Sequence, residues 1–328
     1  MTRKFVYHFR LMKQLLFFFL LISIATNSQD FKKVDSLVLE YPRFSKVDDL
    51  ATRISKDFTS DKDKARAAFY WLAKNIHYNL REYYNPKQRS YHFSYATEKE
   101  KKQKLQALKN KIIDAAFISK KGVCEEYAQS FKKVCDLLGL ESEVIKGTVR
   151  LHPEEIGKPN GNTNHAWNAV KLNNKWVLLD VTWAAGYVMN GKWVQKFNNY
   201  FYDIPKNKIF KTHFPTETIW ALRFGNITLE AFYNQPIYGA SFLNSKIELI
   251  SPITGILKVN SSNEVQLNFK NLAKTSLINY TFKGQRFAKK PIITTLGNTT
   301  TLTFKEAKKN SSLRIFINKE LALQFKTK

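Results

Sequence analysis

The stretch from Lys121 to Gly139, KGVCEEYAQSFKKVCDLLG, constrains the fold of this chain most strongly. Gly122 lets the backbone turn sharply just before Cys124, and Gly139 provides a residue suited to a left-handed helix stop. A thiol on the first turn of a helix lies at the positive end of the macrodipole, which favours the thiolate. Between the glycines, apolar residues recur at steps of three and four and predict one amphipathic helix: Tyr127, Ala128, Phe131, Val134, Cys135 and Leu138.

A second informative stretch begins at Asn164 and consists of two β-rich runs, NHAWNAVKL and KWVLLDVTW. They flank the dipeptide Asn173-Asn174, which is typical of a tight two-residue hairpin turn. If these two residues form the turn, Leu172 lies opposite Lys175 and every pair of facing positions sums to 347. The loop length therefore fixes the register of the predicted hairpin.

That register has a chemical consequence. His165 faces Thr182 and Trp167 faces Asp180, so His165 and Asp180 are diagonal neighbours on one face. A three-residue loop would instead place them on opposite faces. The turn therefore predicts an imidazole–carboxylate pair within hydrogen-bonding reach.

Cys124, His165 and Asp180, in that chain order, have the composition of a thiol triad. The blocks GVCEEYA, NHAWNAV and WVLLDVTW closely resemble the transglutaminase-like cysteine enzyme superfamily, and their spacing is most similar to its kyphoscoliosis-peptidase branch. The resemblance covers residues 45–235. It implies an α+β fold, with a papain/transglutaminase-like catalytic domain in which a helix packs on an antiparallel sheet. It also implies that Cys124 is the nucleophile, His165 its base and Asp180 the residue that orients the base.

Upstream of the nucleophile, the apolar pattern predicts one helix from residue 45 and a second that starts after Ser60. In the family that the chain resembles, a polar or aromatic side chain upstream of the nucleophile helps to bind the oxyanion. Tyr78 is the best-placed match, with His77 beside it. An ordinary packed aromatic is an equally good interpretation of Tyr78. A lysine-rich helix is predicted over 98–116.

The remaining cysteine and histidines carry no comparable pattern. Cys135 lies eleven residues from Cys124 on one predicted helix, about 16 Å along its axis, so the two cannot form a disulfide. We interpret Cys135 as core packing. His152 lies in a polar loop, and His92 and His213 have no companion motif. No His, Cys or carboxylate groups have metal-site spacing, so neither a metal nor another cofactor is expected.

The N-terminus has the pattern of a secretory signal. Basic residues precede the apolar run LLFFFLLISIA, which is too short to span a bilayer. We predict a signal peptide over residues 1–28 and an exported protein, periplasmic or extracellular. Because no cysteine precedes Cys124, the chain is not expected to be a lipoprotein.

Two further segments complete the predicted organisation: the catalytic domain over 30–235 and a C-terminal domain over 236–328. The C-terminal residues form short β-rich runs divided by turn residues at intervals of about ten, which predicts a small immunoglobulin-like β-sandwich. The formal net charge is +26. We interpret it as a solvated basic surface that could attract an anionic cell-surface polymer or lipid, because no nucleic-acid motif is present.

The expected substrate is a protein or peptide, attacked by Cys124 to give a thioester. Passing the acyl group to water would make the chain a peptidase or amidase, which we favour. Passing it to an amine would give protein-glutamine acyl transfer and cross-linking. A different class remains open as well: a binding or adhesion protein that uses the same fold without catalysis.

Overall fold

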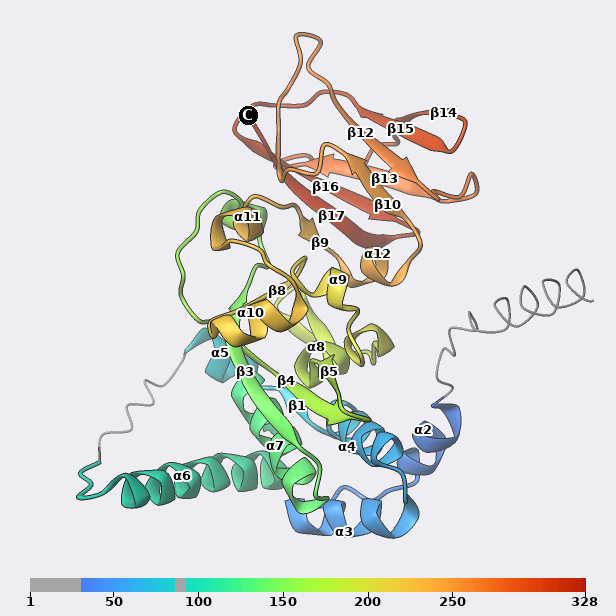
Figure 1. The fold of residues 1–328 in the computed structure, drawn as a ribbon. Helices are drawn as coiled ribbons and strands as arrows, with labels where there is room; N and C mark the ends of the chain where they lie inside the picture. Colours follow the sequence, from blue (N-terminus) through green and yellow to red (C-terminus); the bar gives the residue numbers. More distant parts are fainter. Residues whose placement is uncertain (1–30, 86–92) are drawn as a thin grey trace, which may run out of the picture.

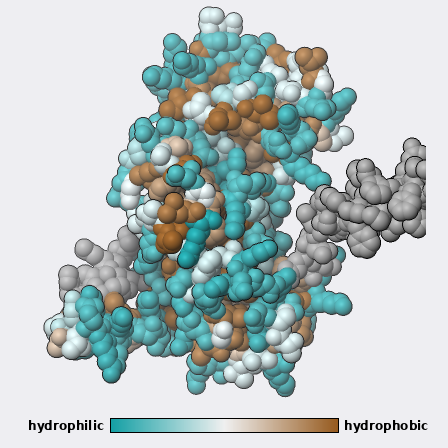
Figure 2. Space-filling model, in the orientation of Figure 1, coloured by the Kyte–Doolittle hydropathy of each residue, from teal (hydrophilic) through white to brown (hydrophobic). Residues whose placement is uncertain are grey.

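The computed structural model describes residues 31–85 and 93–328. The predicted signal peptide and His92 lie outside these ranges, and export stays a prediction. None of the helices in the described ranges combines the length and apolar character needed to cross a membrane. The face drawn in Figure 2 is mainly hydrophilic, with hydrophobic residues in separate areas.

The helix α7, Cys124–Leu137, lies at the centre of the N-terminal part, as its periodicity predicts (Figure 1). Its apolar face is buried, and Gly139 follows it with a φ of +72°. Three helices, α3, α4 and α6, pack against it, and a fourth, α2, packs against α4. α4 begins at the predicted cap, where Ser60 accepts a hydrogen bond from the backbone of Asp63. The four are α2 (Lys32–Leu39), α3 (Val47–Asp57), α4 (Asp61–Asn75) and α6 (Glu98–Ser119).

A four-stranded antiparallel sheet packs on α7 in the order β5-β4-β3-β8. The predicted hairpin register is confirmed, since Leu172 pairs with Lys175 and Asn168 with Leu179. Asn173 and Asn174 have φ values of +49° and +60°, as a two-residue turn of this kind requires. The strands are β3 (Ser142–Val149), β4 (His165–Leu172), β5 (Lys175–Leu179) and β8 (His213–Pro215).

Short elements surround this helix-on-sheet unit. Two of them form a parallel bridge that ties the end of α4 to the start of α7: β1 (His77–Tyr78) and β2 (Lys121–Gly122). The others are α5 (Leu80–Tyr84), η2 (Pro153–Glu155), α8 (Val181–Ala185), β6 (Gly186–Met189), β7 (Lys192–Gln195), η3 (Asn199–Phe201), α9 (Lys206–Ile209), α10 (Thr218–Phe224) and α11 (Leu229–Tyr233).

The C-terminal part consists of two sheets whose inner faces share a hydrophobic core (Figure 1). Alternate residues of β12 are buried, as a sandwich requires. This strand-rich architecture agrees with the predicted β-sandwich, while its immunoglobulin-like character stays a prediction. The first sheet contains β10 (Glu248–Ser251), β12 (Val265–Lys270), β15 (Thr299–Phe304) and β14 (Ile292–Leu296). The second contains β11 (Ile256–Leu257), β17 (Glu320–Thr327), β16 (Ser311–Ile317) and β13 (Ile278–Phe282), with β9 (Ile237–Tyr238) beside β17.

The sequence pattern of the C-terminal part missed one helix, α12 (Ala240–Asn244). It is a single turn that covers β17, too short to produce a visible period. Arg150 joins the two parts of the chain: its guanidinium is buried and donates to the carbonyls of Tyr233, Gln235 and Pro236. The limits predicted for the two domains stay predictions.

Candidate active site

Cys124 is the first residue of α7. Its backbone N–H is therefore among the four at a helix start that have no acceptor within the helix. The β1–β2 bridge fixes the approach to this residue, because Tyr78 pairs with Gly122 and the backbone N–H of Asn79 donates to the carbonyl of Gly122. Cys124 forms no disulfide and is only partly buried.

His165 lies at the start of β4, where it pairs with Gly147 of β3. Its Nε2 is 2.7 Å from Oδ2 of Asp180, and both side chains are buried. The Cys124 thiol lies close enough to the same imidazole to contribute to its raised pKa. With Nε2 engaged by Asp180, Nδ1 is the ring nitrogen left for the thiol. The structure therefore brings Cys124, His165 and Asp180 together.

The expected continuation of the hairpin strand past Asp180 is wrong. β5 ends at Leu179, and the β-branched and aromatic residues that follow form the short helix α8. Asp180 is the N-cap of α8, and its Oδ1 accepts a hydrogen bond of 3.0 Å from the backbone N–H of Trp183. The helix begins here because a capping carboxylate satisfies a free N–H at its first turn.

His213 is the residue that the sequence analysis missed. The residues around it in the sequence contain no companion motif, yet its Nε2 is 3.1 Å from the same Oδ2 of Asp180. Its Nδ1 is 2.7 Å from the hydroxyl of Thr212. The contact exists because β8 pairs with β3, which brings residue 213 opposite Val149. No local pattern could have found it, since Asp180 lies 33 residues away in the chain.

The charges in this cluster depend on burial and on the carboxylate. Burial alone would lower the pKa of His165, but the charge and hydrogen bond of Asp180, with a smaller contribution from Cys124, raise it to about 10. Burial would raise the pKa of Asp180, but the two histidines hold it well below its ordinary value. Burial dominates for His213 and lowers its pKa. At neutral pH the cluster therefore contains a carboxylate, an imidazolium and a neutral imidazole.

Tyr78 lies beside this cluster on β1. Burial, followed by the charge of Cys124, raises the pKa of its phenol, so the hydroxyl remains a donor at neutral pH. Its ring stacks on Trp193, with centroids 5.4 Å apart, and contacts Tyr83 at 5.7 Å. Tyr83 is 43% exposed, so one side of the approach to Cys124 is aromatic and open to solvent.

Comparisons with known proteins agree with this geometry. A family profile described as the transglutaminase-like superfamily matches residues 48–181, which include the cysteine, histidine and aspartate of the cluster. The human kyphoscoliosis peptidase is 25% identical over 239 residues, which are 72% of this chain and 33% of that protein. The chain contains a transglutaminase-like region over residues 48–181, and the kyphoscoliosis peptidases are similar to it over a longer range. The predicted similarity to the kyphoscoliosis-peptidase branch is confirmed, and so is the predicted α+β fold class.

A second relative matches a similar share of the chain. Hillarin of Drosophila melanogaster is 24% identical over 237 residues, which are 67% of this chain and 26% of that protein. The chain thus spans a third or less of the length of these relatives. A solved crystal structure of a TGase overlaps with 58% of this chain and 41% of its own, at 18% identity and a TM-score of 0.28, too low to bear on the fold.

The other sulfur and histidine candidates lie apart from this transglutaminase-like site. Cys135 is fully buried in the core, where burial raises the pKa of its thiol to about 12. It is free, as the helical spacing predicts. His152 is exposed at the cap of η2. His77 precedes Tyr78 on β1 and is exposed.

A metal ion is the alternative occupant of the buried cluster. The ligand atoms of His165, Asp180 and His213 all lie within 4.8 Å of one another. Each of the two imidazoles, however, already has a hydrogen bond to the carboxylate. The three side chains therefore satisfy one another by hydrogen bonds without an ion, and we interpret them as a hydrogen-bonded cluster.

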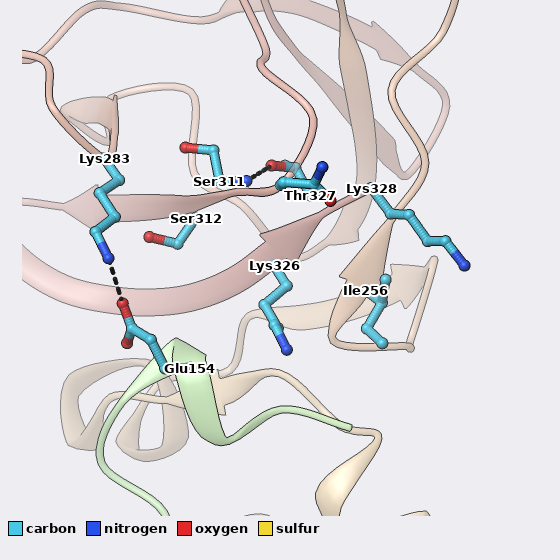
Figure 3. A pocket seen from close by; sticks show the side chains of 9 residues that line it. Glu154, Ile256, Lys283, Ser311, Ser312, Lys326, Thr327 and Lys328 are labelled. Atoms are coloured by element: carbon cyan, nitrogen blue, oxygen red, sulfur yellow. Dashed lines mark hydrogen bonds and ion pairs between the residues drawn. The ribbon is translucent and has the colours of Figure 1, made fainter. Parts of the chain in front are cut away.

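A cavity of about 310 Å³ lies elsewhere, at the junction with the C-terminal sheets (Figure 3). Lys283, Lys326 and Lys328 contribute to its wall, together with serine and threonine hydroxyls. Lys283 forms an ion pair of 3.1 Å with Glu154, and Lys326 donates to the carbonyl of Ile156. Since these contacts already engage two of the three amines, we assign the cavity no chemistry.

Proposed function

We propose that this chain is a cysteine peptidase or amidase that forms a thioester between Cys124 and the acyl group of an amide. The observation that carries the proposal is the cluster itself: a thiol on the first turn of α7, within reach of an imidazole that is bonded to a buried carboxylate. A lone cysteine at a helix start would be weak support. A cysteine with a charged, oriented imidazole is a nucleophile with its acid and base.

The proposed reaction has two halves. The Cys124 thiolate attacks the carbonyl carbon, His165 gives its Nδ1 proton to the departing amine, and the C–N bond breaks to leave a thioester. Water then attacks the thioester carbon and gives a proton to His165. The C–S bond breaks and releases the carboxylic acid. Asp180 keeps Nε2 protonated throughout, so that Nδ1 is the atom that exchanges the proton.

We propose two donors for the oxyanion. The backbone N–H of Cys124 has no helical acceptor, and the phenol of Tyr78 lies close enough to Cys124 for their charges to interact. The raised pKa of Tyr78 supports the proposal, because a phenol stays a hydrogen-bond donor only while it is protonated. A Tyr78→Phe variant would separate this role from aromatic packing.

The fate of the thioester distinguishes hydrolysis from acyl transfer. We propose hydrolysis, because the relatives at 25% identity bear the name kyphoscoliosis peptidase and Cys124 is not fully buried. The substrate we propose is a protein or peptide. Transfer to an amine remains the alternative, and a glutamine peptide offered with and without a primary amine would reveal it as a new amide product.

Alkylation with iodoacetamide tests the nucleophile. At about pH 6.5, an ordinary thiol with a pKa near 8.5 is about 1% thiolate, so an ion-paired Cys124 should react at least about tenfold faster than free cysteine. Buried Cys135 serves as the internal reference for intact folding. His165→Ala should reduce the Cys124 rate to that of an ordinary thiol. If wild-type Cys124 reacts no faster than free cysteine, the chain is a binding scaffold and not a cysteine enzyme.

A further inference from the structure

The Asp180 carboxylate receives more donors than a thiol triad requires. Oδ1 accepts from the backbone of Trp183 and Oδ2 accepts from His165, which already gives each oxygen a partner. His213 adds a third contact, at 3.1 Å, on the same Oδ2 that faces His165. Carboxylates that accept two or three hydrogen bonds are held in the charged form. The extra donor therefore acts on the group that keeps His165 protonated.

The surroundings of His213 fix the proton that it presents. The side chain is fully buried, and its ring lies 4.8 Å from that of Trp183 and 4.9 Å from that of Trp167. Asp180 is ionised, so the contact requires a proton on Nε2 of His213. Nδ1 then accepts from the Thr212 hydroxyl at 2.7 Å, a shorter contact than the 3.3 Å from that hydroxyl to the carbonyl of Ile209.

We propose that His213 is a positioning residue of this site: as a neutral imidazole with its proton on Nε2, it holds Asp180 ionised and turned toward His165. This rests on the proposed function, since it concerns how the acid–base pair of that reaction is maintained. The ionised Asp180 requires the proton on Nε2, Thr212 is the partner of Nδ1, and β8 places the residue beside the carboxylate. The working unit thus extends from Cys124 through His165 and Asp180 to His213.

The titratable groups that interact with Asp180 come from four different elements and fit this assignment. His165 approaches from β4 and His213 from β8, while the phenols of Tyr78 on β1 and Tyr127 on α7 are close enough for their charges to interact with it. Burial keeps both phenols protonated well above neutral pH. A second imidazolium at His213 would face that of His165, whose ring is 5.6 Å away, so the neutral form is favoured.

The first test uses the unaltered protein. Nitrogen-15 NMR of histidine-labelled protein reports the protonation of each ring nitrogen directly. At pH 7 we expect one histidine with both nitrogens protonated, which His165→Ala removes. We expect a second that is protonated on Nε2 alone, which His213→Gln removes. A His213 that is protonated on Nδ1 alone, doubly protonated, or bound to a metal through Nε2 would overturn the proposal.

The second test compares two variants. His213→Gln places an amide donor near the position of Nε2, whereas His213→Leu fills a similar volume without a donor. Losing one charge-assisted hydrogen bond corresponds to about a tenfold effect, so His213→Leu should alkylate Cys124 about tenfold more slowly at pH 6.5, with its pH profile displaced to higher pH. In His213→Gln the rate of Cys124 alkylation should fall only about threefold. A merely structural role would lower the rate without displacing the profile, and that result would overturn the proposal.

The two proposals fail separately. Slow, unselective alkylation of Cys124 in the wild-type protein would refute the proposed function. Fast wild-type alkylation together with identical pH profiles for wild type and His213→Leu would end only the role of His213. Near-ultraviolet circular dichroism, which reports the tryptophans packed around the site, identifies a variant that has not folded. In that case the nitrogen-15 measurement on wild type still decides.

Discussion

The buried pair of His165 and Asp180 makes stability depend on pH in a defined direction. The folded pKa of His165, about 10, is above its ordinary value of 6.5. Such a group contributes its full stabilisation below about pH 6.5 and loses it as the pH rises toward 10. In Asp180→Asn the charge that opposes burial is gone, so His165 should be neutral in the fold. The variant should therefore lack this loss between about pH 7 and pH 10.

The magnitude follows from the same values. One pKa unit corresponds to about 1.4 kcal/mol, so a change from 6.5 to about 10 is worth at most about 5 kcal/mol. Cys124 contributes to the raised pKa of His165. Both proteins are therefore compared in a Cys124→Ser background. There we expect the unfolding free energy of the protein with Asp180 to fall by about 3 kcal/mol relative to Asp180→Asn between about pH 7 and pH 10.

The assay is urea unfolding followed by tryptophan fluorescence at several pH values in that range. Asp57→Asn is the matched control, because Asp57 forms a 2.7 Å ion pair with Arg53, whose side chain is 39% exposed. Neither group changes its charge between about pH 7 and pH 10. The unfolding free energy of this variant should therefore change with pH in the same way as that of its parent. The reasoning is refuted if the unfolding free energy of Asp180→Asn changes with pH in the same way as that of the protein with Asp180. In that case His165 would not be an imidazolium in the folded protein.

Two further predictions concern the framework of the site. Arg66 is 2% exposed and binds Asp35 at 2.6 Å. Because breaking a buried ion pair leaves its partner uncompensated, Arg66→Met should lower the unfolding free energy by about 3 kcal/mol. An unchanged midpoint of urea unfolding would show that the pair does not stabilise the fold. A Cβ on Gly147 would come within 2.1 Å of the carbonyl oxygen of Phe214, so Gly147→Ala should push β8 from β3, cost about 3 kcal/mol and slow Cys124 alkylation. Gly139→Ala, with nothing within 4 Å, should cost only the strain of its positive φ, about 1 kcal/mol, and leave alkylation unaffected.

The sequence contains the information for the parts of the site that depend on local rules. The periodicity of α7 places Cys124 at a helix start, and two asparagines fix the hairpin register because both adopt a positive φ. A fixed register determines which side chains share a face, so the contact between His165 and Asp180 was predictable without coordinates.

The failures have a common cause. The residues after Asp180 are of types that favour strands, but the contacts of α8 with α4 and α7, together with the capping carboxylate, favour a helix there. His213 depends on the pairing of β8 with β3, across 64 residues from Val149. Long-range pairing of this kind leaves no trace in the residues around His213, whereas local turns and periods do.

The change from strand to helix at Asp180 also explains how one carboxylate serves two imidazoles. In an extended strand, both oxygens of Asp180 would project from one face of the sheet with no backbone donor beside them. As the N-cap of α8, the side chain instead turns back so that Oδ1 accepts from Trp183 and Oδ2 is fixed toward His165 and His213. The helix start therefore supplies the orientation, and the second imidazole reinforces the charge. The departure from the predicted strand is the feature that makes a three-donor carboxylate possible at this position.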